Sequence, residues 1–248
     1  MKKIILISIA FLFIFCKNET KQNFDDYFPV DKQDQIIKHQ YYTIAYCPKY
    51  KEAVWVGYNL SLNMIKGNAK RPKTFSVDPI LIYPSAQNSD YYKSGFDKGH
   101  LCPAADMKFS QTAMDETFYL SNVSPQRADL NRKKWEKLES LVRSWLSSID
   151  SDLFIFTGTL FDKSNTTIGD DKIAVPYAFY KIIYDYKASP QKMIAFILPN
   201  KECNKRLTKY VVPVDSIQKL TNIDFFPKVD LPLQTKLEAH SDTMQWNW

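Results

Sequence analysis

The most regular pattern of apolar positions in the chain lies between residues 131 and 149. Apolar side chains recur there at spacings of three and four, which is the period of one face of an α-helix. They are Trp135, Leu138, Leu141, Val142, Trp145, Leu146 and Ile149. Charged and small polar residues occupy the positions between them. The pattern therefore predicts an amphipathic helix over residues 131–149 with one face against a core.

Elsewhere the apolar pattern predicts strands. Five segments are rich in β-branched and aromatic residues and are separated by Gly, Pro or Asn. They are residues 41–46, 53–60, 153–157, 177–186 and 193–198. The turn Cys47-Pro48-Lys49 joins the first two into a predicted hairpin, and residues 213–220 fit a short helix. Because strands outnumber helices and do not alternate with them, we expect an α+β fold with a mostly antiparallel sheet.

The first sixteen residues have the features of an export signal. Lys2 and Lys3 precede an uncharged run of 12 residues, from Ile4 to Phe15. This run is too short to span a bilayer, which needs about 20 residues. We therefore expect residues 1–16 to direct export, and the protein to be periplasmic, secreted or an outer-membrane lipoprotein.

Cys16 at the end of this run resembles the lipid-modified cysteine of bacterial lipoproteins, which would attach the protein to a membrane. The bulky Phe15 departs from that pattern, so ordinary cleavage nearby and an uncleaved anchor stay open as alternatives. The polar composition of residues 17–40 predicts an arm or tether. Residues 41–248 are expected to form a single domain, because chains of up to about 250 residues often fold as one.

The chain carries a mild positive charge. Its 33 Lys and Arg residues against 27 Asp and Glu give a net charge of +6, which falls to +4 without the two lysines of the export segment. A charge of this size fits a polyanionic partner but does not require one. The cysteines after residue 16 are Cys47, Cys102 and Cys203, so at most one disulfide can form among them.

One loop concentrates positive charge. Residues 66–73, with the sequence KGNAKRPK, contain four cations and no acid, and Gly67 and Pro72 indicate a loop. Two interpretations are open. Such a loop is usually solvated surface, and the alternative is a contact between Arg71 and a phosphate.

The chain has three histidines, and one of them lies in a motif. His39 falls in the expected arm and His240 lies near the C-terminus, so a zinc site built from several imidazoles is disfavoured. The sequence also lacks a P-loop, a Gly-x-Gly-x-x-Gly run, a Gly-x-Ser-x-Gly elbow and a Cys-x-x-Cys pair. His100, within the segment FDKGHL, is the remaining candidate. Any chemistry must therefore depend on few residues.

A single histidine near an Asn- and Glu-bearing helix suggests phosphodiester hydrolysis with one metal ion. That reaction needs a base for water, a group that neutralises the phosphate oxygens and stabilisation of the leaving oxygen. His100 could be the base, since an ordinary histidine pKa of about 6.5 leaves it largely neutral near neutral pH. Mg²⁺ could supply the other two functions, because it keeps most of its waters and needs only one or two protein oxygens. Asn131 offers a neutral oxygen.

The predicted helix arranges two polar residues in order. If it begins near Asn131, then Asn131 and Glu139 lie along one side, with Glu139 about 12 Å further along the axis. Glu139 would then reach metal-bound water rather than the metal. A second interpretation needs no metal: Asn131 caps the helix, and Glu139 pairs with Lys or Arg at the surface.

Three ordered strings of residues carry a family resemblance. They are DKGHLCPAADM at 97–107, ETFYLSNVSPQ at 116–126 and LNRKKWEKLE at 130–139. Together they closely resemble the DNA/RNA non-specific endonuclease family of ββα-metal nucleases, whose members include secreted bacterial and mitochondrial nucleases. Weaker similarity extends from the Trp55 strand to Pro227. The resemblance implies a ββα-metal nuclease fold, with a mostly antiparallel central sheet flanked by helices.

The resemblance also implies a role for each matched position. His100 would be the general base, Asn131 the direct metal ligand, and Glu139 would hold waters of the metal. Asn122 would orient the histidine and the phosphate region, and Arg71 would clamp a phosphate oxygen. The implied cofactor is Mg²⁺, with Mn²⁺ as the alternative, and the implied substrates are DNA and RNA.

Lys98 marks a departure from the family pattern, which has arginine there. Lysine keeps the positive charge but loses the planar fork that matches phosphate, so substrate positioning could differ. Lys98 and Gln126 are expected to contact the substrate. Asp97 is expected to be a structural acceptor that fixes the loop.

The resemblance implies an exported, Mg²⁺-dependent endonuclease that cleaves DNA and RNA with little sequence preference and leaves 5′-phosphates. Weak discrimination follows if the contacts are mainly to phosphates. The alternative is a surface nucleic-acid-binding lipoprotein without turnover, which would bind through residues 66–73 and Lys133-Lys134. A toxin ranks lower, because residues 17–40 contain no delivery module. The oligomeric state stays open, a homodimer included.

Overall fold

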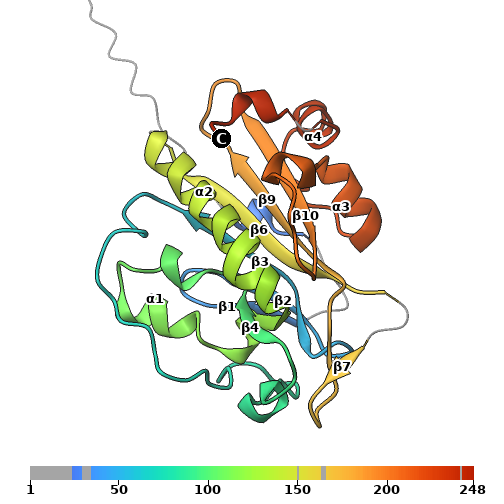
Figure 1. Cartoon of the computed structure of the whole chain (residues 1–248). Helices are drawn as coiled ribbons and strands as arrows, with labels where there is room; N and C mark the ends of the chain where they lie inside the picture. The colour runs from blue at the N-terminus through green and yellow to red at the C-terminus, as the bar shows by residue number, and fades with distance from the viewer. Residues whose placement is uncertain (1–23, 30–34, 150, 163–165, 241) are drawn as a thin grey trace, which may run out of the picture.

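A sheet of antiparallel strands forms the centre of the protein (Figure 1). The computed structural model describes residues 24–29, 35–149, 151–162, 166–240 and 242–248. Within them, seven strands hydrogen-bond in the order β1-β2-β3-β6-β9-β10-β11, and each neighbouring pair is antiparallel. They are β1 (Gln35–Lys38), β2 (Thr43–Cys47), β3 (Glu52–Leu60), β6 (Leu153–Leu160), β9 (Ala178–Asp185), β10 (Lys192–Pro199) and β11 (Val211–Val212).

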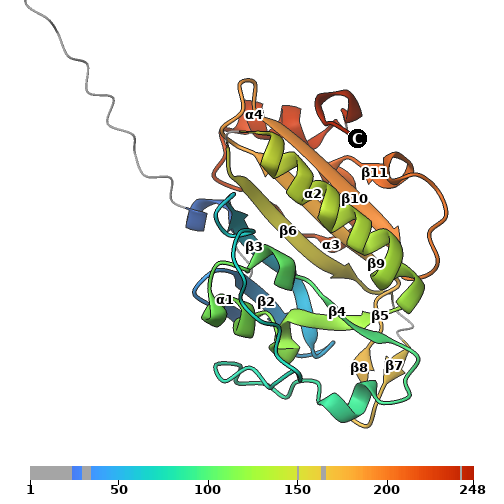
Figure 2. The ribbon, with the colours of Figure 1, turned by 60° about the vertical axis from the view of Figure 1, so that its left-hand side comes forward.

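Helices cover both faces of this sheet (Figures 1 and 2). One face carries α2 (Glu136–Ser148), and the other carries α3 (Val214–Thr221) and α4 (Leu231–Glu238). Side chains of a strand alternate between the two faces, so Ile155 joins the core beneath α2, whereas Phe156 joins the core beneath α3. Because both faces are covered, β6 and β9 are buried along their whole lengths.

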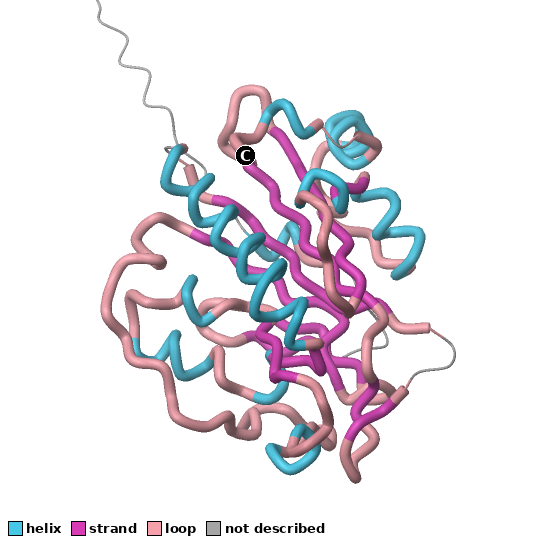
Figure 3. Tube along the Cα trace, viewed as in Figure 1, coloured by secondary structure: helices cyan, strands magenta, loops and turns pink. Residues whose placement is uncertain are grey.

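A smaller lobe lies beside the sheet and below α2. It contains the two-stranded ribbon of β4 (Asp97–His100) and β5 (Val123–Gln126), together with α1 (Gln111–Glu116). Long loops connect these elements to the sheet (Figure 3). A second ribbon pairs β7 (Thr167–Ile168) with β8 (Ile173–Ala174). The β4–β5 ribbon next to the start of α2 places the family motifs side by side.

The expected α+β fold with a mostly antiparallel sheet is confirmed. The strand predicted over 53–60 is β3 at Glu52–Leu60, and the one predicted over 193–198 is β10 at Lys192–Pro199. The short helix predicted over 213–220 is α3 at Val214–Thr221. These segments were predictable because their apolar positions match the period of the element that they form.

The helix predicted from residue 131 begins differently from a regular α-helix. Its first turn is a π-helical turn, η5 (Leu130–Trp135), which leads directly into α2. A π turn contains about one residue more than an α turn. The regular α-helical spacing assumed between Asn131 and Glu139 therefore does not apply to this first turn. Asn131 is not a capping residue, because the turn already begins at Leu130 with Asp129 in the N-cap position. Its side-chain amide donates to Asp97.

The described part of the expected arm packs on the sheet. Tyr27 is buried against Phe154, with ring centroids 5.0 Å apart, and Phe28 stacks on Trp55 at 5.6 Å. Residues Gln35–Lys38 form the edge strand β1. A tether is therefore the wrong description of these parts, because aromatic side chains lie among the polar residues. The expected export segment 1–16 and Cys16 lie outside the described residues.

Among the helices that the structure describes, none is both long and apolar enough to cross a bilayer.

The packing of the N-terminal segment predicts a stability effect. Replacing Tyr27 with alanine removes a ring from a cluster with Phe154, Tyr184 and Phe226. We expect Tyr27→Ala to lower the free energy of unfolding by about 3 kcal/mol. As a control, Lys38→Ala removes only an exposed ion pair and should change it by less than about 0.5 kcal/mol. Urea unfolding measures both, and equal small effects would show that the segment is a tether after all.

Candidate active site

The β4–β5 ribbon sets the directions of the motif side chains. Gly99 pairs with Ser124, and His100 pairs with Val123. Because strand residues alternate, Lys98 and His100 lie on the face opposite to Asp97. A Cβ on Gly99 would lie 2.3 Å from Oε1 of Gln126, so the strand needs glycine at this position. The Gly-His step of the motif thus lets Gln126 pack closely beneath the strand.

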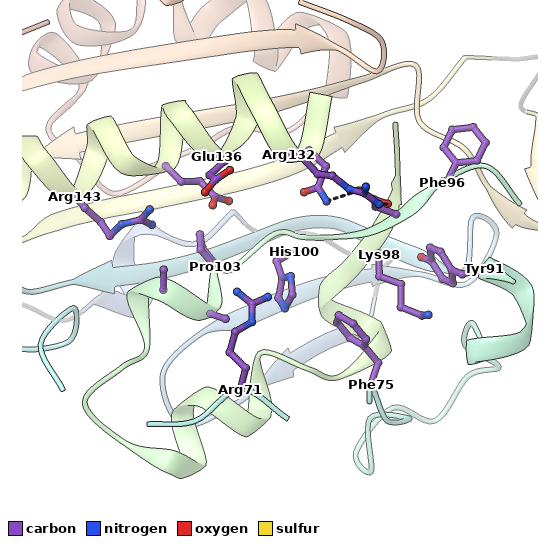
Figure 4. A pocket seen from close by; sticks show the side chains of 15 residues that line it. Arg71, Phe75, Tyr91, Phe96, Lys98, His100, Pro103, Arg132, Glu136 and Arg143 are labelled. Carbon is purple, nitrogen blue, oxygen red and sulfur yellow. Dashed lines mark hydrogen bonds and ion pairs between the residues drawn. The ribbon is translucent and has the colours of Figure 1, made fainter. Parts of the chain in front are cut away.

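A cavity of about 570 Å³ lies between this ribbon and the start of α2 (Figure 4). Figure 4 shows Arg132, Glu136 and Arg143 on the helix side, with His100, Lys98 and Arg71 on the opposite side. The cavity brings together five of the residues expected at the site. They are Arg71, Lys98, His100, Asn131 and Glu139.

His100 is held between aromatic rings. Its ring centroid lies 5.2 Å from that of Phe75 and 5.0 Å from that of Phe118. Nε2 of His100 is buried and has no hydrogen-bond partner among the described residues. Burial, and after it the positive charge of Arg71, lowers the pKa of His100 to about 3. The imidazole is therefore neutral at physiological pH and keeps a free lone pair.

Asp97 controls the orientation of Asn131. Oδ2 of Asp97 accepts a hydrogen bond from Nδ2 of Asn131 at 2.9 Å and from Nε of Arg132 at 2.8 Å. A carboxylate can only accept, so the NH₂ group of Asn131 must face it. Burial alone would raise the pKa of Asp97, but the hydrogen bonds from Arg132 and Asn131 outweigh this effect and lower it. The acceptor role expected for Asp97 is observed, and the amide oxygen of Asn131 is left for another partner.

Glu139 lies on the same wall of the cavity and is surrounded by charges. Burial raises its pKa to about 7, whereas the positive charges of Lys181 and Arg143 act in the opposite direction. Glu139 is therefore not the solvent-facing residue of the second interpretation.

Arg143, which is partly exposed, forms an ion pair with the buried Asp106 beside Glu139. Nη1 of Arg143 donates to Oδ1 of Asp106 at 2.9 Å, and the hydroxyl group of Tyr58 donates to Oδ2 at 2.8 Å. Both carboxylate oxygens of Asp106 are therefore satisfied. The pair fixes Arg143 at the cavity wall, one helical turn after Glu139.

Arg71 and Lys98 bring positive charge to the opposite wall. The loop that carries Arg71 is fixed by Gln111, whose side chain accepts from the backbone N–H of Lys70 at 2.9 Å and donates to its carbonyl at 2.8 Å. The Arg71 guanidinium lies 5.3 Å from the centroid of the Phe118 ring. The Lys98 ammonium lies 4.9 Å from the ring centroid of Tyr91, and burial lowers the pKa of Lys98.

Asn122 and Gln126 do not line the cavity. Oδ1 of Asn122 accepts from the backbone N–H of Cys102 at 2.9 Å, and Nδ2 donates to the carbonyls of Cys102 and Thr117. Asn122 thus holds the chain just after His100 and cannot contact substrate with the same groups. Gln126 is buried behind Gly99, with its amide atoms unpaired among the described residues. Both side chains are therefore buried outside the cavity.

Several residues at the cavity were not anticipated. Arg143 and Glu136 lie four residues after and three residues before Glu139, so a helical projection of the motif could have found them. Arg132 follows Asn131 directly. Phe75 comes from a loop with no motif, and its position could not be derived from spacing.

Comparisons with known proteins agree with this architecture. The family model for DNA/RNA non-specific endonucleases matches residues 19–231. Human mitochondrial endonuclease G is 34% identical over 210 residues, which cover 79% of this chain and 70% of that protein. Nuclease C1 from Cunninghamella echinulata var. echinulata is 36% identical over 214 residues, which cover 79% of this chain and 84% of the relative. The crystal structure of the EndoG/EndoGI complex superimposes with a TM-score of 0.74 at 28% identity, covering 83% of this chain and 90% of that one.

These comparisons confirm the resemblance and the ββα-metal nuclease fold, and they correct the expected localisation. Several relatives are named as mitochondrial nucleases, among them endonuclease G and EXOG. The expectation of an exported protein, whether periplasmic, secreted or in the outer membrane, is contradicted by these names. The expectation came from residues 1–16 alone, and an apolar run behind two lysines does not specify one destination.

The environment of His100 predicts an unusual titration. An ordinary histidine titrates between about pH 8 and about pH 5. Because burial and Arg71 lower the pKa of His100 to about 3, its ring proton resonances should not shift in this range. NMR of the protein can test this, with His100→Ala assigning the resonance. A midpoint near pH 6.5 would contradict the described burial.

Replacing Arg143 should show how much an unpaired buried charge lowers the free energy of unfolding. Arg143→Met leaves the buried carboxyl group of Asp106 without its ion-pair partner, so we expect the free energy of unfolding to fall by about 3 kcal/mol. The double variant Arg143→Met/Asp106→Asn removes that charge as well and should recover part of the loss. Denaturant unfolding compares them, and equal losses in the two variants would argue against the ion pair.

Proposed function

The chain belongs to the DNA/RNA non-specific endonuclease family, and we propose that it hydrolyses internal phosphodiester bonds of DNA and RNA with Mg²⁺ as cofactor. The observation that carries this proposal is the pairing of a neutral His100 with an oriented Asn131 in one cavity. Residues 41–248, together with the described part of the preceding segment, would act as one nuclease domain.

The donor set of the cavity fits a hard divalent cation. The amide oxygen of Asn131 is available because its nitrogen donates to Asp97, and Glu139 adds a carboxyl group with a raised pKa. Mg²⁺ accepts oxygen ligands and is commonly held by one or two protein groups, with water completing its shell. We propose that Asn131 holds the cation directly and that Glu139 holds its waters, with Mn²⁺ as a substitute. When bound, the cation would supply Lewis-acid stabilisation of the phosphate and of the leaving oxygen.

His100 is the proposed general base. Its neutral ring can take a proton from a water that attacks phosphorus. Burial, and after it the positive charge of Arg71, lowers the pKa of this ring. A bound phosphate opposes the charge of Arg71, so it would raise the pKa of His100 and make the imidazole a stronger base. Substrate binding would thus prepare the base for the reaction.

The cations of the opposite wall are proposed to hold the phosphate. Arg71 offers a planar fork of donors that matches two phosphate oxygens, whereas Lys98 offers a single ammonium group. The Lys98 ammonium lies over the rings of Tyr91 and Phe75. These rings restrict the positions of the side chain and leave its positive charge in the cavity. Contacts of this kind read no base, which accounts for weak sequence preference. Departure of the 3′ oxygen would leave 5′-phosphate products.

Asn122 and Gln126 are proposed as positioning residues. Asn122 fixes the backbone at Cys102, two residues after the base, and Gln126 packs against Gly99, one residue before it. Neither would touch the substrate. Because the side chains of Asn122 and Gln126 are buried, these two residues lie near His100 without lining the cavity.

The binding-only alternative gains no support from the site. A protein that only binds nucleic acid needs cations, but it does not need a neutral histidine beside an oriented amide oxygen. Both groups line the same cavity here. We therefore favour turnover over binding alone.

The proposal predicts metal-dependent cleavage of closed circular DNA. The full chain with Mg²⁺ should nick and linearise plasmid and degrade folded RNA on gels, and EDTA should stop both reactions. His100→Ala should lower the cleavage rate by at least about 10²-fold, since it removes the base. His240→Ala, an exposed histidine far along the chain, is the matched control and should cut like the parent. Full activity of the folded His100→Ala variant would overturn the assignment of the base.

A further inference from the structure

A second concentration of positive charge lies outside the cavity, between β10 and β11. Residues 201–209 have the sequence KECNKRLTK, with four cations and one acid. Lys201, Lys205, Arg206 and Lys209 are all exposed. In the part of the chain that the structure describes, none of these four forms a salt bridge. Their charges are therefore available to a partner.

The segment is held firmly in place. Cys203 and Leu207 are buried in the core beneath α2, so the cations between and beside them face outward. At its start, Oδ1 of Asn200 accepts from the backbone N–H of Arg127 at 2.8 Å, and Nδ2 of Asn200 donates to the carbonyl of Pro125 at 2.9 Å. The backbone of the segment is therefore already ordered, and binding an anion would cost only the conformational freedom of the Lys and Arg side chains.

Two contacts connect this segment with the cavity. Nζ of Lys134 donates to the carbonyl of Lys205 at 2.9 Å, and Lys134 follows Arg132, which lines the cavity, by two residues. At the other end, the guanidinium of Arg127 lies 5.2 Å from the ring centroid of Phe96, another cavity residue. Figure 2 shows the loop between β10 and β11 beside the N-terminal end of α2. The segment therefore lies next to residues at the edge of the cavity.

Nearby acids do not cancel this charge. The acid within the segment, Glu202, lies 4.0 Å from Lys133, which also pairs with Asp129 at 2.8 Å. Lys133 balances one of these two carboxylates, so a single negative charge remains and the other cations stay in excess. We call these cations the basic band. They are Arg127, Lys134, Lys201, Lys205, Arg206 and Lys209.

We propose that the basic band binds backbone phosphates of the nucleic acid beyond the cleaved bond. This inference rests on the proposed function, because the strand would pass from the cavity around the start of α2 onto the band. Lysine-rich surfaces bind phosphate through charge and release counterions, without reading bases. The band would therefore give affinity for long substrates of any sequence and add nothing for a substrate confined to the cavity.

Two matched double variants test the proposal. Lys205→Gln/Lys209→Gln removes two cations from the band, and Lys219→Gln/Lys236→Gln removes two exposed lysines from α3 and α4. Both lower the net charge of the full chain equally. Binding of a long DNA duplex is measured in EDTA at several salt concentrations, so the readout does not need cleavage. Arg206→Gln serves as an independent single variant, and thermal unfolding checks that all variants are folded.

The expected result is a change in salt dependence for the band variants alone. Each lost phosphate contact lowers the slope of log Kd against log salt by about 0.9, so the band double variant should lose about 1.8 and the single variant about 0.9. The α3/α4 variant should keep the slope of the parent. Equal slopes for the two double variants would overturn the proposal, as would parental binding by the band variant, which would fit an acidic protein partner. Failure of the parent to cut plasmid in Mg²⁺ would instead contradict the proposed nuclease function.

Discussion

The hydrogen bonds of Asp97 are the interaction on which the site depends. This carboxylate on β4 accepts from Asn131 and Arg132 of the π-helical turn, and it thereby joins the ribbon to the helix. The same contact turns the amide oxygen of Asn131 away from the carboxylate. Together with the ion pair between Arg143 and Asp106, it connects the two walls of the cavity by polar contacts. The same acceptor also orients the amide that one wall offers.

Because both faces of the sheet are covered, a charged side chain on one of its central strands is costly to bury and needs charged partners. Lys181 lies on β9, a strand buried along its length, and its ammonium group donates to Oγ1 of Thr157. It also lies 5.3 Å from the ring centroid of Trp135, and burial lowers its pKa. A buried cation of this kind needs anions nearby, and Glu139 and Asp106 both favour its charged form. The positive charge of Lys181 and the carboxyl groups of Glu139 and Asp106 therefore stabilise one another.

Much of the fold was predictable from the chain, because apolar spacing reports burial. The amphipathic segment that becomes α2 and the strands β3 and β10 follow from periodicity. The three motif strings indicated His100, Asn131 and Glu139 through their resemblance to the family. The N-terminal segment was misjudged, because average polarity concealed Tyr27 and Phe28, which pack on the sheet. Composition averages over residues, whereas packing depends on single side chains.

The sequence by itself determined the architecture, the family and the residue types of the site. Only the tertiary structure decided which motif residues meet in the cavity. Asn122 and Gln126 belong to a different motif string from His100 and do not line the cavity, because Gln126 faces the other side of the β-ribbon and hydrogen bonds to the backbone occupy the Asn122 amide. The pKa of His100 and the alignment of residues 201–209 with the helix start also depend on neighbours distant in the chain. Desolvation and charge act through space, so linear spacing cannot reveal them.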